Sequence, residues 1–103
     1  MGEKHTLGII VNSNRYFNFV TSLADAALDK GIHVRIHLLG SGCEYINTRA
    51  CIRLGHLIRI TLCSASAHGN TLQQIESIKG WISLVPPQVL SMVMQACNRS
   101  VIF

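Results

Sequence analysis

The sequence predicts a single α/β domain built around a five-stranded, mostly parallel sheet. Short apolar segments alternate along the chain with segments of helical spacing, and this alternation is typical of repeated strand–helix–strand units. The 103 residues leave room for one domain. No repeat, linker or low-complexity segment interrupts the alternation. We therefore expect one domain over residues 1–103.

The strands are predicted from runs of apolar residues. Residues 7–11 form a continuous apolar run, which is typical of a central parallel strand buried on both faces. Residues 32–39 alternate between apolar and polar side chains, so we expect one wet face and a place near the sheet edge. The remaining predicted strands, in chain order, are residues 57–63, 81–85 and 101–103.

Helices are predicted where apolar side chains recur every three or four residues, at about residues 15–30, 45–54, 71–78 and 88–97. The turn Asn12-Ser13-Asn14 has the residue types that cap the first helix, and Gly31 suits its left-handed end. Gly40 to Cys43 is predicted to be a flexible loop after the second strand. Five strands alternating with helices predict a flavodoxin-like three-layer sandwich.

Composition indicates the assembly and the compartment. Hydrophobic residues make up 49% of the chain and charged residues 14%, against about 25% charged in typical domains. We expect a homo-oligomer that covers part of this apolar surface. The net charge of +4 is scattered and aromatic residues are few, which argues against direct nucleic-acid binding. No leader or membrane span is evident, so a cytoplasmic protein with reduced cysteines is expected.

Metal and nucleotide binding have weak signals. His33 and His37 would lie about 13 Å apart on one strand face and cannot share a zinc ion, and the cysteines lack the spacing of a zinc site. We expect no metal and no organic cofactor. Gly40-Ser41-Gly42 lacks the full pattern of a phosphate loop. The turn at residues 12–14 nevertheless leaves open a small-anion or nucleotide site at the start of a helix.

Cys43 and Cys63 both lie at the ends of predicted strands, at the same edge of the sheet. If the strand order were 2-1-3, Cys43 and Cys63 would lie two strand spacings apart, about 9.5 Å. A disulfide requires Cα atoms within about 7 Å, so a redox pair would need loop movement.

Cys63 is the strongest candidate nucleophile. It closes an apolar strand and precedes small residues, which places a thiol at the carboxyl edge of a parallel sheet, where open α/β folds place their chemistry. His68 follows five residues later and is a candidate proton donor or cation. The alternative is that Cys63 is simply a small buried residue.

Two blocks of the sequence resemble the DsrE/TusD group of small sulfur-transfer proteins. The first block, residues 60–69, is a strand that ends in cysteine and leads through small residues to His68-Gly69. The second, residues 88–103, is a helix, a short polar turn with Arg99, and a terminal strand. The resemblance covers most of the chain and implies a flavodoxin-like fold that assembles into trimers, hexamers or mixed complexes.

The resemblance implies that Cys63 accepts sulfane sulfur as a persulfide and passes it to a partner protein. Our hypothesis from the position of His68 is that it helps to stabilise the negative sulfur as a second catalytic residue. Donor and acceptor proteins are the expected partners. The alternatives are a small-anion or nucleotide module and a non-catalytic scaffold subunit. The predicted substrate-contacting residues are Asn12, Ser13, Asn14, Gly42, Cys43, Ser64 and Ala65.

Overall fold

The computed structural model describes residues 5–64, 82–86 and 88–103. Its strands form one five-stranded sheet in which every pair of neighbours is parallel, in the order β4-β3-β2-β1-β5. In chain order the strands are β1 (Thr6–Val11), β2 (His33–Leu38), β3 (Arg59–Cys63), β4 (Ile82–Val85) and β5 (Arg99–Ile102). The parallel α/β fold predicted from the sequence is confirmed and is consistent with a flavodoxin-like sandwich.

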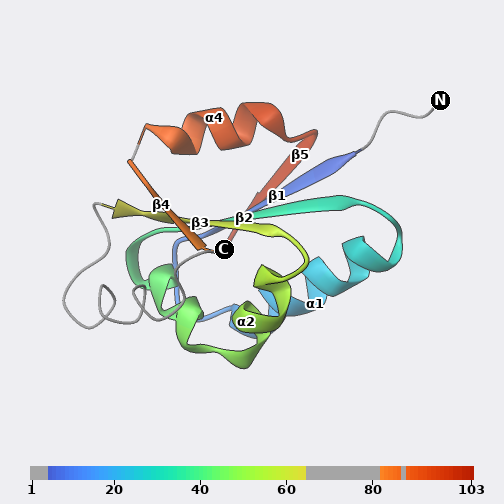
Figure 1. The fold of residues 1–103 in the computed structure, drawn as a ribbon, viewed down its shortest axis with the longest axis horizontal. Coiled ribbons are helices and arrows are strands. Elements are labelled where there is room, and N and C mark those ends of the chain that lie inside the picture. The colour runs from blue at the N-terminus through green and yellow to red at the C-terminus, as the bar shows by residue number, and fades with distance from the viewer. Residues whose placement is uncertain (1–4, 65–81, 87) are drawn as a thin grey trace.

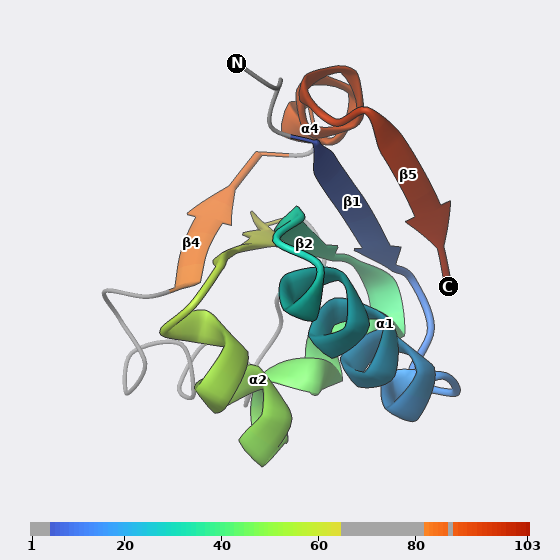
Figure 2. The ribbon, with the colours of Figure 1, turned by 90° about the vertical axis from the view of Figure 1, so that its right-hand side faces the viewer.

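Helices lie on both faces of the sheet. The helices α1 (Phe17–Asp29) and α2 (Arg49–Gly55) cover one face, and α4 (Val89–Ala96) covers the other (Figures 1 and 2). A 3₁₀ helix, η1 (Gly40–Asn47), connects β2 to α2. The predicted helix at residues 71–78 lies outside the described residues, as does Trp81 at the start of the fourth predicted strand.

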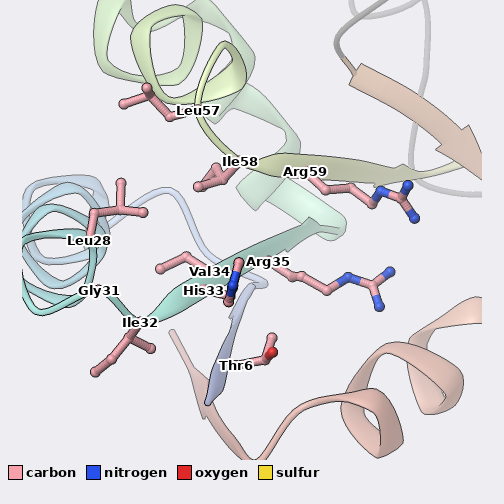
Figure 3. A pocket seen from close by; sticks show the side chains of 10 residues that line it. All are labelled: Thr6, Leu28, Gly31, Ile32, His33, Val34, Arg35, Leu57, Ile58 and Arg59. Atoms are coloured by element: carbon pink, nitrogen blue, oxygen red, sulfur yellow. The ribbon is translucent and has the colours of Figure 1, made fainter. Parts of the chain in front are cut away.

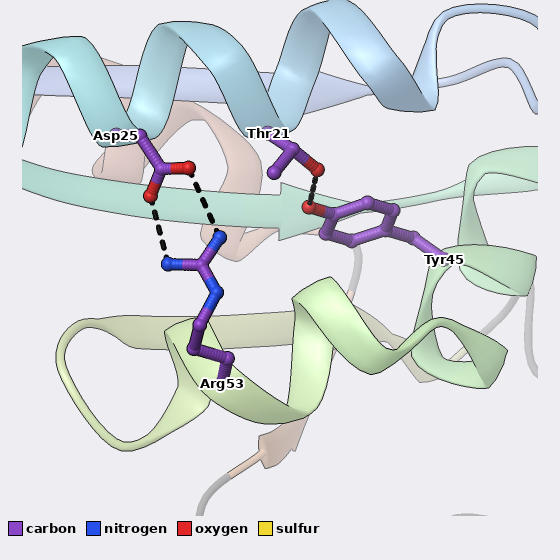
Figure 4. A network of polar contacts seen from close by, with 4 residues as sticks. All are labelled: Thr21, Asp25, Tyr45 and Arg53. Carbon is purple, nitrogen blue, oxygen red and sulfur yellow. Dashed lines mark hydrogen bonds and ion pairs between the residues drawn. The ribbon is translucent and has the colours of Figure 1, made fainter.

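The main apolar core lies between the sheet and the α1 and α2 helices. Alternate residues of the three interior strands enter it, including Ile9, Ile36 and Leu62. Tyr45 of η1 is fully buried there, and its hydroxyl is 2.6 Å from the hydroxyl of Thr21 on α1 (Figure 4). The wide apolar runs of these strands are explained by this burial, since parallel strands are covered by helices.

A paired guanidinium and carboxylate join α1 to α2. Arg53 donates two hydrogen bonds to the carboxylate of Asp25, at 2.8 and 3.0 Å (Figure 4). Both side chains are about half exposed, at 49% and 44%, so this ion pair contributes little to stability.

The position of β2 differs from the prediction. β2 is the central strand and not a strand near the edge. Its polar face is covered at His37, whose buried ring is hydrogen-bonded to Thr61 of β3, whereas His33 is exposed and Arg35 is half-buried. The expected wet face is therefore present at His33 and Arg35, whereas the expected place near the sheet edge is wrong.

The segment after β2 also differs from the prediction. Residues 40–43 are not a flexible loop but the first half of η1, and Gly42 and Cys43 are buried. The helix predicted at residues 45–54 is divided at Thr48, whose hydroxyl accepts a hydrogen bond of 3.1 Å from the Cys51 amide and caps α2. Thr48 thus ends one helix and begins the next.

Candidate thiol site at the carboxyl edge of the sheet

Cys63 is the last residue of β3, at the carboxyl end of an interior strand. It pairs in register with Val85 of β4, and Leu62 before it pairs with Leu38 of β2. Its side chain is 6% exposed. Leu62 belongs to the main apolar cluster and Cys63 does not, because successive side chains of a strand point to opposite faces. The thiol therefore lies on the α4 side of the sheet.

Cys43 lies close to this thiol. Burial is the main cause that raises the pKa of Cys43 to about 11, and the charge of the nearby Cys63 raises it further. The proximity follows from the strand order, because β3 lies beside β2 and not two spacings from it. Both cysteines are free in the structure. The expectation that Cys43 and Cys63 are two strand spacings apart, which depended on a 2-1-3 order, is therefore wrong.

The close approach of η1 to β1 positions Cys43. The amide of Leu39 donates to the carbonyl of Val11, and the amide of Gly42 donates to the carbonyl of Leu39, both at 3.0 Å. A Cβ on Gly42 would lie 1.9 Å from the Val11 carbonyl oxygen. Gly40 has a φ of +56°, which favours glycine. The two glycines of the Gly-Ser-Gly segment thus serve packing against β1.

The turn at residues 12–14 and η1 hold five of the predicted substrate-contacting residues and lie in contact with each other. The amide nitrogen of Asn14 donates a hydrogen bond of 3.0 Å to the carboxylate of Glu44 in η1. Asn12, which is exposed, has its side-chain oxygen 2.8 Å from where a Cβ on Gly40 would stand. The predicted cap is wrong, because α1 begins at Phe17 with Tyr16 as its N-cap and no capping side chain. Ser13 instead accepts a hydrogen bond from the Arg15 amide at 3.1 Å.

His37 is a residue of this site that the sequence analysis did not identify. It is 1% exposed, and its Nδ1 atom is 2.8 Å from the hydroxyl of Thr61. Thr61 and Cys63 share one face of β3, so the Cα atoms of His37 and Cys63 are about 8 Å apart. Burial, and secondly the charge of Arg35, lowers the pKa of His37, which keeps its ring neutral at pH 7. The sequence signal that could have identified His37 is the alternation of apolar and polar residues along the segments that form β2 and β3, in which His37 and Thr61 are register partners.

The other two cysteines, Cys51 and Cys97, have the surroundings of residues that serve packing and not of nucleophiles. Cys51 is fully buried in α2, and burial raises the pKa of its thiol to about 12. The sulfur of Cys97 would be 2.9 Å from a Cβ on Gly8, so this thiol packs directly against β1. Burial also raises the pKa of Cys97, against an opposing effect of the Arg35 charge. A thiol held protonated in this way is a poor nucleophile.

Three predicted site residues follow β3. Ser64 is exposed and directly adjoins Cys63. Ala65 and His68 lie outside the described residues. Within residues 5–64, 82–86 and 88–103, no three side chains of His, Cys, Asp or Glu are grouped so that they could hold a metal ion.

The chain matches no known protein-family model, and no curated protein sequence matches it. Among the helices of the described residues, none has both the length and the hydropathy needed to cross a bilayer.

Proposed function

We propose that this protein is a sulfur-relay protein in which Cys63 accepts sulfane sulfur as a persulfide and passes it to a thiol of a partner protein. The observation that carries the proposal is the place of Cys63, at the carboxyl edge of an all-parallel sheet and beside a second thiol. The carboxyl edge is where open α/β sheets bind their ligands. The resemblance of residues 60–69 and 88–103 to the DsrE/TusD group favours the same chemistry.

The relay has two exchange steps, and neither needs an oxidant or a reductant. The Cys63 thiolate attacks the outer sulfur of a donor persulfide, so that a bond forms between the two sulfurs and the donor leaves as a thiolate. An acceptor thiolate then attacks the outer sulfur of the Cys63 persulfide, and Cys63 is released as a thiolate. Attack by a thiolate on a sulfur–sulfur bond is the general chemistry of such exchange.

The raised pKa of Cys43 supports a relay more than a disulfide redox pair. A thiol with a pKa of about 11 is ionised to only about one part in 10,000 at pH 7, and the thiolate is the attacking form. Cys43 therefore attacks a persulfide on Cys63 slowly, although it lies nearby. The persulfide remains available for an external acceptor instead of being resolved into an internal disulfide with loss of hydrogen sulfide.

Incubation with a persulfide donor, followed by mass spectrometry of the intact protein and its peptides, tests the proposal. We expect an adduct of about 32 Da on Cys63, which Cys63→Ser abolishes. Cys51→Ser is the matched control, because Cys51 is buried in the core on the opposite face of the sheet, and it should leave the adduct unchanged. An adduct that persists in Cys63→Ser contradicts the assignment.

Access to the buried thiol is tested separately by alkylation. Iodoacetamide should modify Cys63 in the native protein before it modifies Cys51. If Cys63 reacts only after the protein is unfolded, the relay is excluded and the alternative of a non-catalytic scaffold subunit is favoured.

The second candidate, a small-anion or nucleotide module, uses the meeting of the residue 12–14 turn with η1. This arrangement provides a polar surface, yet it places the carboxylate of Glu44 on the side chain of Asn14. A carboxylate at that point repels an anion. A thermal-shift screen with nucleotides separates the two functions, because stabilisation by a nucleotide together with an inert Cys63 favours the module.

A homo-oligomer, a trimer or a hexamer by the family resemblance, is also part of the proposal. Large apolar side chains are exposed on several elements: Phe19, Ile52, Leu57, Leu84, Met92 and Ile102. Such surface in a small protein favours burial between subunits. Sedimentation equilibrium gives the subunit number directly, and a monomer at micromolar concentration contradicts this part of the proposal. We propose a cytoplasmic location on the basis of the four free cysteines.

A further inference from the structure

The described residues form a pocket of about 540 Å³ at the amino-terminal ends of β2 and β3, but its lining does not suit one small ligand. Figure 3 shows that the guanidinium groups of Arg35 and Arg59 extend away from the apolar side chain of Leu28. The cationic and the apolar side chains lie on opposite faces of the sheet, so a small molecule cannot contact both. A better-defined recognition surface is the outer edge of β5.

β5 is the last strand of the sheet and is paired with β1 on one side only (Figure 2). The amide of Phe103 donates to the carbonyl of Ile10 at 2.8 Å, and its carbonyl accepts from the amide of Asn12 at 2.7 Å. Because the backbone groups of successive strand residues face opposite sides, those of Ser100 and Ile102 face away from β1. No strand of the described residues pairs with them. Such a row of donors and acceptors is a template for another strand.

The side chains beside this edge are apolar on both faces of the sheet. Val101 is 37% exposed and shares the α1 face with Phe103, which packs against the main core. Ile102 is 62% exposed and points to the opposite face. The ring centroid of Tyr16 is 6.3 Å from that of Phe19 and 6.4 Å from that of Phe103. These three rings form an aromatic cluster at the carboxyl end of β5, in which Phe19 is 65% exposed.

A cation lies at the other end of the same strand. Arg99 is exposed and is the register partner of Leu7, which packs against the main core, so Arg99 is on the same face as the aromatic cluster. The described carboxylates are Asp25, Asp29 and Glu44, and none of them forms an ion pair with Arg99. Arginine side chains bind over the faces of aromatic rings. β5 therefore holds both halves of such a contact, at its two ends.

We propose that β5 pairs with β5 of a second copy of this chain, antiparallel and about a two-fold axis at Val101, so that the two sheets become one. Ser100 of each copy lies opposite Ile102 of the other, which satisfies the outward backbone groups of both residues. Arg99 of each copy lies opposite Phe103 of the other, beside its aromatic cluster. The same surface serves both copies, as a two-fold contact requires. A parallel pairing would place the two Arg99 side chains together, where like charges repel.

The available surface is near the lower limit for a specific interface. At about 200 Å² for a whole aromatic side chain, the exposed parts of Phe19 and Tyr16 supply about 200 Å² on each copy. With Val101, Ile102 and the strand backbone, the two copies bury on the order of 1,000 Å² in total. The inference rests on the homo-oligomer of the proposed function and assigns its contact. It leaves the Cys63 end of β3 open, because β3 is three strand spacings from β5, about 14 Å.

Sedimentation velocity at micromolar concentration tests the pairing. Val101→Lys places two like charges at the axis, and Ile102→Pro removes an outward amide without touching the bonds to β1. Each variant should halve the subunit number of the wild type and keep its circular dichroism spectrum. Leu84→Lys is the matched control, because Leu84 is 46% exposed on β4, the opposite edge strand, and it should leave the subunit number unchanged. An odd subunit number in the wild type, or halving in Leu84→Lys alone, overturns the proposal.

The antiparallel register is tested with two further variants. Val101 and its copy form a non-hydrogen-bonded pair with Cα atoms about 4.5 Å apart, within the range of a disulfide. Oxidation of Val101→Cys with diamide should therefore give a dimer linked between the two residues 101, identified by peptide mass spectrometry, and its absence overturns the register. Arg99→Gln should weaken association about tenfold, since two cation–aromatic contacts are lost. Arg49→Gln, on the exposed side of α2, is its control, and an equal effect of both contradicts the contact.

The persulfide adduct on Cys63, measured on the same variants, separates this inference from the relay. Val101→Lys should lose association and retain the adduct. Association through β5 in a wild type that forms no adduct supports the pairing and contradicts the relay alone. A monomeric wild type that forms the adduct overturns the pairing and leaves the relay intact.

Discussion

Replacement of Gly42 by alanine should displace η1 from β1 and destabilise the protein strongly. The new Cβ would lie 1.9 Å from the carbonyl oxygen of Val11 and 3.0 Å from a methyl group of the same residue, and separations below 3.0 Å are essentially never seen for real Cβ atoms. Val11 belongs to an interior strand that is bonded on both sides and cannot retreat. The clash is therefore relieved by movement of η1.

The magnitude follows from the contacts that this movement breaks. The hydrogen bonds from Leu39 to Val11 and from Gly42 to Leu39 are both 3.0 Å long, and the loss of each costs about 1 kcal/mol. Partial exposure of Cys43 and Ile46, which are 3% and 4% exposed, removes about 1 to 2 kcal/mol of apolar burial. A loss of about 3 to 4 kcal/mol is a large share of the stability of a typical domain, about 5 to 15 kcal/mol.

Urea unfolding followed by circular dichroism measures this loss, and Gly31→Ala is the matched control. Gly31 has a φ of +76°, but a Cβ placed there meets no atom within 4 Å. Its replacement should cost only the backbone strain, about 1 to 2 kcal/mol. If Gly42→Ala loses no more stability than Gly31→Ala, the close approach of η1 to β1 is refuted. In the same experiment, Cys43 should become more reactive toward iodoacetamide in Gly42→Ala.

Four further outcomes are expected. Thr61→Val leaves the buried Nδ1 atom of His37 without its partner and should lower the free energy of unfolding by about 1 to 3 kcal/mol, whereas Thr61→Ser should retain most of it; urea denaturation compares the two. Burial lowers the pKa of His37 from its usual 6.5. As the pH falls, His37 is therefore protonated in the unfolded chain before it is protonated in the folded protein. Its contribution to stability is fully present above about pH 6.5 and is lost as the pH falls toward the lowered folded-state pKa; His37→Asn should flatten this slope in unfolding measurements. Tyr45→Phe keeps the buried ring but removes the hydroxyl contact of 2.6 Å with Thr21, and should lower the free energy of unfolding by about 1 kcal/mol. An unchanged free energy of unfolding contradicts a stabilising hydrogen bond at this position. Cys43, with a pKa of about 11, should react with iodoacetamide at pH 8 at least about 100-fold more slowly than an ordinary thiol, and Cys63→Ser should lower the midpoint of its pH–rate profile; a midpoint near 8.5 in the wild type contradicts this.

The parallel sheet could be predicted because its strands are recognisable one at a time. The apolar run of β1 reports burial on both faces, and Gly31 has the positive φ expected at the end of the first helix. Placing Cys63 at the carboxyl edge required only the end of β3 and the rule that parallel strands end at one edge.

Long-range pairing was not predictable in the same way. The wet face expected for β2 holds for His33 and Arg35 but not for His37, because the partner that buries His37 is 24 residues away, on β3. The helical form of residues 40–43 was missed for a similar reason. Gly-Ser-Gly is locally typical of a loop, and only the contact with the β1 backbone shows why Gly42 is required. The proximity of Cys43 to Cys63 then depended on the strand order, which no local pattern reports.

The strand order has a consequence for how the polypeptide acquires its structure. β1, β2 and β3 are consecutive along the chain and adjacent in space, so each joins the growing layer through a short closure with a small entropic penalty. β5 docks against β1 instead, and the hydrogen bond between Thr6 and Asn98 spans 92 positions. Contacts between distant parts of the chain form slowly. The β1–β2–β3 part of the sheet, which ends at Cys63 and η1, should therefore acquire protection from hydrogen exchange first, and β5 should acquire it later.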